Sequence, residues 1–275
     1  MSARRSADPS PTPRPSGIPR RAAVGAALAL GATAAWHIGP AGTWLPAVRH
    51  TLFPDLDGQG NPGHVALTFD DGPSPESTPL FLRALDELSV RATFFVLGDA
   101  LRHDPRIGHA IAGRGHEIAV HGWHHERPWY PTPWRDAHDL ARAADLVQQV
   151  CGRRPRWYRP PYGILTGGRW AAARRAGMRP VLWSASGHDW TAEADGASVL
   201  AEITGSLRGG GTVLLHDSDC TSAPGAWHAA LDALPELVSH CREAGLTVGP
   251  LAEHEVGGPG RGSGGTARCR RGRAW

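Results

Sequence analysis

Short apolar runs alternate with amphipathic stretches along most of this chain. Seven runs have the length and the β-branched or aromatic content of buried strands, and they lie near 65–69, 92–96, 117–120, 157–159, 180–184, 212–216 and 246–248. Six stretches between them carry apolar residues at helical spacing, near 78–88, 104–112, 135–150, 167–176, 197–207 and 228–244. This alternation predicts an α/β fold whose parallel sheet closes, or nearly closes, into a barrel of about seven units.

A long uncharged segment precedes this pattern. From Ala22 to Val48 there is no Asp, Glu, Lys or Arg, and the part up to Trp36 is strongly apolar. Several Arg residues come before it, which favours a cytoplasmic N-terminus and export of everything downstream. Two alternatives are open for this apolar helix, a cleaved signal peptide or a transmembrane anchor. We favour the anchor, which predicts an extracytoplasmic domain at the cell membrane, or a secreted one if the segment is cleaved.

The segments around the periodic region have compositions that cannot build a core. Residues 1–21 are rich in Pro, Ser and Arg, and residues 257–275 are rich in Gly and Arg, so both are expected to be disordered tails. Residues 22–48 form the anchor or signal segment, and residues 49–63 are interpreted as a linker. The remaining residues, 64–256, are long enough for one large α/β domain.

Composition and charge exclude several classes of protein. The chain is 41% hydrophobic and 20% charged, which is typical of a globular protein with a substantial core. All 29 of its basic residues are Arg, and no interior Arg cluster is interleaved with aromatic residues, so nucleic acid is not an expected partner. The four cysteines have no CxxC spacing, which argues against a cysteine zinc site. Free thiols and, after export, a Cys220–Cys241 disulfide remain alternatives.

The main functional signal is the chemistry that follows the predicted strands. In parallel α/β barrels the active site lies at the carboxyl ends of the strands. Polar or titratable side chains follow five of these strands: Asp70 and Asp71; His121, His124 and His125; Arg159; His188, Asp189 and Trp190; and His216 and Asp217. Their gathering at one face of the barrel predicts an active site there.

The acidic pair and two of the histidines point to a metal. Asp70 and Asp71 end an apolar run, and burying two unpaired carboxylates is costly, so they are expected to bind something. His121 and His125 are spaced i, i+4, which places both imidazoles on one side if the segment is helical. Two histidines and one carboxylate leave coordination positions open, which is the pattern of a catalytic metal. His124 is interpreted as a bystander.

These residues lie in segments that resemble the five motifs of the polysaccharide deacetylases, the NodB-homology enzymes of carbohydrate esterase family 4. The matching segments are 68–73, 121–125, 159–163, 189–190 and 214–217, in the family's order across roughly residues 64–250. The resemblance implies a distorted (β/α)7 barrel. It also implies metal-dependent removal of N-acetyl, or in some members O-acetyl, groups from a glycan. Two positions depart from the family pattern, Gly122 and Ser186, and neither is a ligand, base or acid.

The resemblance further implies a metal site and a proton-transfer pair. Asp71, His121 and His125 would bind the divalent metal, which is most often Zn²⁺, with Co²⁺, Ni²⁺ or Mn²⁺ as alternatives. Asp70 would be the general base that deprotonates the attacking water, and His216 would be the general acid that protonates the leaving amine.

The remaining matched positions would orient these groups or bind the substrate. Arg159 would hold the base, and Asp189 would hold the acid. The backbone N–H of Tyr162 would help to stabilise the oxyanion. Trp190 and Leu214 would line the pocket for the acetyl methyl group.

Three functions are compatible with these observations. The first is an N-deacetylase of a polysaccharide containing N-acetylglucosamine, either peptidoglycan or a chitin-like glycan, and the expected envelope location favours it. The second is an O-acetyl xylan esterase. The third is a catalytically silent glycan-binding module, since a fold can lose activity. The intact set of predicted ligands, base and acid argues against the third. An acetylated glycan is the expected partner, and the chain is expected to act as a monomer.

Overall fold

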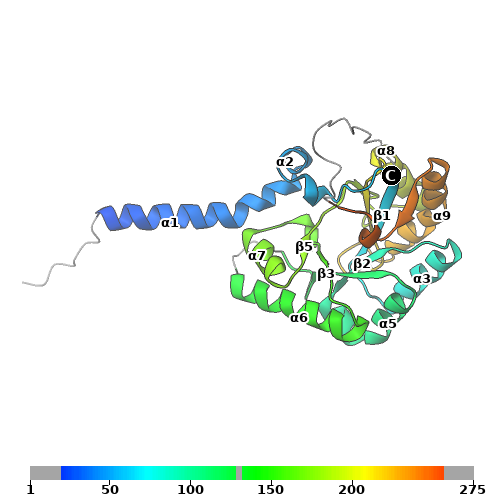
Figure 1. Cartoon of the computed structure of the whole chain (residues 1–275), viewed down its shortest axis with the longest axis horizontal. Helices are drawn as coiled ribbons and strands as arrows, with labels where there is room; N and C mark the ends of the chain where they lie inside the picture. The colour runs from blue at the N-terminus through cyan, green and yellow to red at the C-terminus, as the bar shows by residue number, and fades with distance from the viewer. Residues whose placement is uncertain (1–19, 128–131, 257–275) are drawn as a thin grey trace, which may run out of the picture.

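A parallel sheet curled into an incompletely closed barrel forms the core of the structure (Figure 1). The computed structural model describes residues 20–127 and 132–256. Its strands are β1 (His64–Asp70), β2 (Thr93–Leu97), β3 (Glu117–Gly122), β4 (Trp157–Tyr158), β5 (Arg179–Pro180), β6 (Ala185–Ser186), β7 (Thr212–His216) and β8 (Thr247–Gly249). They run in the order β5-β4-β3-β2-β1-β7-β6, and β8 pairs with the first residues of β1. The predicted parallel, distorted barrel is thus confirmed.

The barrel is incompletely closed, because β5 and β6 lie at the two ends of this strand order. They flank residues 181–184, which we call the seam. The sequence predicted one strand here, near 180–184, whereas the structure has two short strands, β5 before the seam and β6 after it. The seven predicted strands therefore correspond to eight observed ones.

The helices that follow the strands cover the outside of the sheet (Figure 1). They are α3 (Thr78–Glu87), α4 (Gly98–His103), α5 (Pro105–Gly113), α6 (Pro133–Cys151), α7 (Gly167–Arg175), α8 (Gly196–Ser206) and α9 (Trp227–Glu243). The six predicted helices are all present. Local hydrogen bonds set several of their starts; for example, Asp195 and Ser198 form a reciprocal capping box at the start of α8. The sequence missed α4, since six residues are too few to show a helical period.

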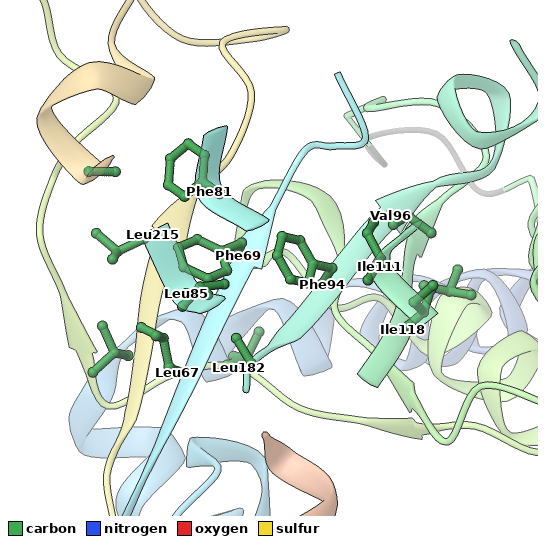
Figure 2. Packing of buried hydrophobic residues seen from close by; sticks show 14 of the residues in the cluster. Leu67, Phe69, Phe81, Leu85, Phe94, Val96, Ile111, Ile118, Leu182 and Leu215 are labelled. Atoms are coloured by element: carbon green, nitrogen blue, oxygen red, sulfur yellow. The ribbon is translucent and has the colours of Figure 1, made fainter. Parts of the chain in front are cut away.

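The two-residue period of the strands divides the core into an outer and an inner layer. On β1, Phe69 faces outward and packs edge-on against Phe81 of α3 at 5.1 Å between ring centroids, as Figure 2 shows. Ala66 belongs to a separate inner cluster together with Phe95 and Ala119 of the neighbouring strands. Because both faces of β1 are covered, all seven of its residues are buried, which explains why its apolar residues occur on both faces and do not alternate with exposed polar ones.

The N-terminal segment forms helices that precede the barrel. They are α1 (Arg20–Ile38), η1 (Gly39–Trp44), α2 (Pro46–Leu52) and η2 (Pro54–Asp57). Helix α1 extends away from the barrel (Figure 1), although its last turn contacts α7, where Gly167 lies directly against the carbonyl of Trp36. The segment 22–48, predicted as an anchor, is therefore divided among three helices. None of the helices in the described ranges combines the length and apolarity needed to cross a bilayer.

The region interpreted as a linker, residues 49–63, packs on the barrel and contacts the seam. The backbone N–H of Leu182 donates to the carbonyl of Leu56 at 2.7 Å, and the Thr212 hydroxyl donates to the carbonyl of Gly58 at 2.7 Å. The buried Arg49 forms an ion pair with Asp57 and donates to the carbonyl of Trp183 at 3.1 Å. This region is therefore part of the folded domain.

Two further expectations concern the cysteines and the tails. Cys151, Cys220 and Cys241 are free thiols, so the Cys220–Cys241 disulfide is not formed. Cys269 and most of the two predicted tails lie outside the described residues.

Candidate active site

The candidate site lies inside the barrel, at the carboxyl ends of the strands, next to the inner layer of the core. Asp70 lies two residues beyond Thr68 on β1, and His121 lies two residues beyond Ala119 on β3. Side chains two apart on a strand share a face, so both polar groups point into the barrel above small residues. Arg159 follows β4, and its side chain lies over the ring of the inward-facing Phe95, 4.0 Å from the centroid. The strand ends therefore place charged groups together at one open end of the barrel interior, which we call the mouth.

Asp71 reaches the same mouth by breaking this alternation. A regular strand would point Asp70 and Asp71 to opposite faces. Asp71 instead has φ of 77°, a left-handed conformation that is uncommon outside glycine. The next residue, Gly72, lies so close to Asp217 that a Cβ would be 2.4 Å from the carboxylate, which excludes larger side chains. The backbone of Asp71, rather than only the Gly72–Pro73 turn, therefore brings two consecutive carboxylates into one site.

Asp71, His121 and His125 form a cluster whose ligand atoms all lie within 4.8 Å of one another. The Nε2 atoms of His121 and His125 lie 3.2 and 3.4 Å from Asp71 Oδ1. That oxygen is buried, and within the described part of the chain it accepts no hydrogen bond. The other oxygen, Asp71 Oδ2, accepts a hydrogen bond from the Thr221 hydroxyl at 3.0 Å. A buried carboxylate oxygen facing two imidazoles is a fitting donor set for a divalent cation.

The protonation of these groups also suits a cation. Burial tends to raise the pKa of Asp71, but the close approach and charge of His121, with the charges of His216 and His125, hold it well below its usual range. Burial, reinforced by the neighbouring His121, lowers the pKa of His125 to about 4. At neutral pH Asp71 is therefore an anion and His125 a neutral imidazole, the forms that bind metals.

The two histidines are not on a helix, contrary to the conditional expectation from their spacing. His121 belongs to β3, and His125 lies in the loop that follows. Gly122 turns the chain between them with φ of 146°, and a Cβ there would lie 3.1 Å from the carbonyl of His124. His124 itself faces Asp99, 3.8 Å away, which agrees with its interpretation as a bystander.

Asp70 is held by a buried ion pair. Its Oδ1 accepts a hydrogen bond from Arg159 Nη1 at 2.7 Å, and the same nitrogen donates to the Thr68 hydroxyl at 2.8 Å. Arg159 Nη2 donates to the carbonyl of Leu182 in the seam at 2.8 Å. The Arg159 side chain is fully buried, so its charge is stabilised by these partners rather than by water.

His216 and Asp189 form a second charged pair across the mouth. Asp189 accepts one hydrogen bond from the His216 ring at Nδ1, at 3.0 Å, and another from the His216 backbone N–H at 2.7 Å. Burial disfavours the imidazolium, but the charge and hydrogen bond of Asp189, with the charges of Asp71 and Asp70, raise the pKa of His216 to about 10. His216 is thus a proton donor at neutral pH.

A cavity of about 680 Å³ opens between the two pairs. Its lining includes most of the predicted site residues, namely Asp70, His121, His125, Tyr162, Trp190, Leu214 and His216. The other three, Asp71, Arg159 and Asp189, lie behind this surface and are at most 2% exposed. Tyr162 has φ of 59° and packs edge-on against His125 at 4.3 Å between ring centroids. Trp190 packs edge-on against His216 at 5.5 Å.

The structure adds residues that the sequence did not single out. The Thr221 hydroxyl donates a hydrogen bond to the Asp71 carboxylate. The Thr68 hydroxyl accepts one from the Arg159 guanidinium, which also bonds Asp70. Pro46, from the expected anchor or signal segment, and Arg49, from the expected linker, also line the cavity. Thr68 could have been found from its place two residues before Asp70, whereas the others arrive through contacts between distant parts of the chain.

Comparisons with known proteins agree with this geometry. Residues 57–181 match the family model for polysaccharide deacetylase. A chitooligosaccharide deacetylase from Bradyrhizobium sp. is 32% identical over 69% of this chain and 89% of its own. A peptidoglycan-N-acetylglucosamine deacetylase from Bacillus cereus is 30% identical over 69% of this chain and 67% of its own. A crystal structure of a peptidoglycan N-acetylglucosamine deacetylase superposes with a TM-score of 0.65 at 28% identity, covering 72% of this chain and 90% of the other. The chain therefore belongs to the polysaccharide deacetylase family, carbohydrate esterase family 4, as its five motifs predicted.

Proposed function

We propose that this protein removes N-acetyl groups from a glycan that contains N-acetylglucosamine, such as peptidoglycan or a chitin-like polymer. The observation that carries the proposal is the placement of a candidate metal cluster between a carboxylate held by Arg159 and a histidine held by Asp189. Hydrolysis of an amide needs an activated water, a base and an acid, and this cavity has a candidate for each. The relatives named for chitooligosaccharide and peptidoglycan deacetylation support the substrate class.

Asp71, His121 and His125 would hold the metal, which we expect to be Zn²⁺. Two imidazoles and a carboxylate match the ligand set of catalytic zinc sites. When bound, such a cation lowers the pKa of water toward about 7 and polarises a carbonyl oxygen. Thr221 would orient the Asp71 carboxylate through its hydrogen bond to Oδ2.

Asp70 is the proposed base. Arg159 and its partners fix one carboxylate oxygen, and Asp70 also lines the cavity, so its carboxylate can accept a proton from the attacking water. The other carboxylate oxygen, Oδ2, lies 3.7 Å from His121 Nδ1, close to the metal ligands.

His216 is the proposed acid. Asp189 fixes the ring through Nδ1, which leaves Nε2 as the nitrogen free of this bond and able to donate a proton to the departing amine. An amine is a poor leaving group unless it is protonated, so an acid that stays charged at neutral pH suits an amide substrate. Trp190 packs against this ring and, with Leu214, gives the cavity an apolar wall for the acetyl methyl group.

Tyr162 is the proposed backbone donor to the oxyanion. Its left-handed conformation places it on the cavity wall beside His125. Losing one such donor typically costs about 3 kcal/mol of transition-state stabilisation.

Export of the chain stays a prediction from the basic residues that precede the apolar segment, and it would give the enzyme access to envelope glycans.

Acetate release from a panel of acetylated glycans, with and without a chelator, tests the proposed function. We expect chelator-sensitive release from N-acetylglucosamine oligomers or peptidoglycan. Release from acetylated xylan alone would identify an O-acetyl esterase instead. If none of the substrates yields metal-dependent acetate, the chain is a silent glycan-binding module.

Metal analysis of the purified protein tests the ligand set. Asp71→Ala removes the carboxylate that both imidazoles face, so this variant should retain only a small fraction of the wild-type divalent metal. His124→Ala is a matched control, because His124 faces Asp99 instead. Elemental analysis by mass spectrometry gives the metal-to-protein ratio. Wild-type metal content in Asp71→Ala would exclude this site.

Asp70→Asn separates the base from the ligands. The change keeps the size of the side chain but removes its ability to accept a proton. We expect turnover to fall by about 10²–10⁴-fold, the usual contribution of a general base. Metal content should stay near that of the wild type. Loss of the metal from Asp70→Asn would instead mean that the ligand and base assignments of Asp70 and Asp71 are reversed.

The pH dependence of kcat tests the acid. His216 acts in its protonated form, so activity is retained below its pKa and lost as the pH rises through it. Asp189→Asn removes the charge that raises this pKa, so the alkaline limb should move to lower pH by about 1–3 units. Asp145→Asn, an exposed acid on α6, is the control and should leave the limb in place. An unmoved limb in Asp189→Asn would rule out the proposed His216–Asp189 pairing in catalysis.

A further inference from the structure

Asp217 is a buried carboxylate for which the proposed reaction has no role. It follows His216 at the end of β7, it is 1% exposed, and it is not among the residues that line the active-site cavity. Within the described ranges, no basic side chain forms an ion pair with it. A buried carboxylate without a cationic partner is costly unless hydrogen bonds compensate it. Its contacts with the protein, rather than contact with a substrate, must therefore explain its position.

Hydrogen bonds join Asp217 to the loop between β1 and α3. The Thr78 hydroxyl donates to Asp217 Oδ2 at 2.5 Å and accepts from the backbone N–H of Ser74 at 2.8 Å. The Ser77 hydroxyl donates to the backbone carbonyl of Asp217 at 2.6 Å. The backbone N–H of Asp217 donates to the carbonyl of Asp70 at 3.3 Å. Both the start and the end of this loop are thus bonded to one residue.

The same carboxylate limits the position of Gly72. A Cβ on Gly72 would lie 2.4 and 2.6 Å from the two carboxylate oxygens of Asp217, so the carboxylate fills the space beside that backbone. From β2, the backbone N–H of Leu97 donates to the Gly72 carbonyl at 2.8 Å. Gly72 is therefore held by contacts from two other strand ends. Its neighbour Asp71 has the left-handed φ of 77°, and such a conformation persists only where the surrounding structure determines it.

The segment that follows β7 thus acts on Asp71 in two ways. The Thr221 hydroxyl bonds Asp71 Oδ2, and Asp217 holds the backbone one residue further along the chain. The remaining oxygen, Oδ1, faces the two imidazoles at 3.2 and 3.4 Å. Residues that orient a metal ligand in this way are as a rule important for binding, since their loss typically lowers metal affinity about 10–100-fold.

We propose that Asp217 is a positioning residue for the metal ligand Asp71. It acts through the backbone of Gly72 and through Thr78, which together keep Asp71 in the conformation that points Oδ1 at the two histidines. This inference rests on the proposed function, because it requires that the cluster binds a divalent metal. It adds that metal affinity depends on a carboxylate that is neither a ligand nor a part of the cavity wall.

Titration of the metal-free protein with Co²⁺ tests this role, because the visible absorption of bound Co²⁺ reports both its affinity and its coordination geometry. Asp217→Ala removes the contacts with Gly72 and Thr78. We expect its dissociation constant for Co²⁺ to rise about 10–100-fold, with a changed spectrum. Asp217→Asn keeps the size of the side chain and an oxygen for the Thr78 hydroxyl, so it should retain the wild-type spectrum and most of the affinity.

Thr78→Val tests the same contact from its other side, and it decides the question if Asp217→Ala does not fold. It keeps the shape of the side chain but removes the hydroxyl that bonds Asp217, so the dissociation constant should again rise, by about tenfold. Thr93→Val is the matched control, since the buried Thr93 hydroxyl also donates to a carboxylate, Glu117 Oε2 at 2.8 Å, but lies at the start of β2. Thr93→Val should keep wild-type Co²⁺ binding. Thermal unfolding of the metal-free proteins measures the stability that each variant loses.

The outcomes separate this inference from the proposed function. Wild-type Co²⁺ affinity and spectrum in Thr78→Val, and in Asp217→Ala where it folds, would overturn the positioning role while the deacetylase remains. An equal loss of affinity in Asp217→Asn would assign the effect to the negative charge, and an equal loss in Thr93→Val would assign it to general instability. Either result would also overturn the positioning role. If the wild type binds no Co²⁺ and releases no acetate, the inference and the proposed function fail together.

Discussion

The buried ion pair between Asp70 and Arg159 is the constraint on which the rest of the site depends. Neither charge could lie in the barrel interior alone, because removing one partner of a buried pair leaves the other charge uncompensated, at a typical cost of about 3–5 kcal/mol. The pair joins the end of β1 to the end of β4, and the second guanidinium nitrogen bonds the seam through Leu182. The barrel therefore has to fold around this contact, and in doing so it orients the proposed base.

The metal cluster depends on a different feature, a local departure of the backbone from regular strand geometry. Regular alternation sends Asp70 inward, and the left-handed Asp71 adds a second carboxylate at the same mouth. Gly122 does the equivalent on β3, where it lets the chain turn so that His125 rejoins His121. Strained or rare backbone conformations thus occur where two neighbouring positions must serve one site, which is a recurrent property of functional centres.

The alternation of strands and helices and the position of the site at strand ends could be predicted from the sequence, because both follow from short-range periodicity. The helical spacing of His121 and His125 was misleading, since the same residues meet through a strand end and a loop. The contributions of Thr221 and Arg49 could not be predicted, because each reaches the site across more than a hundred residues of chain. Contacts of that range depend on the closure of the barrel, which local patterns do not encode.

The packing of the N-terminal segment has a consequence for how the domain can be presented. Arg49 fixes this segment at the seam, and the last turn of α1 lies against Gly167 of α7. Helix α1 extends from the barrel (Figure 1), and the contact of its last turn with α7 limits how the helix and the barrel can move relative to each other. Any structure that binds the exposed, apolar part of α1 would therefore also orient the opening of the active-site cavity. That orientation would determine which glycan strands the site can reach.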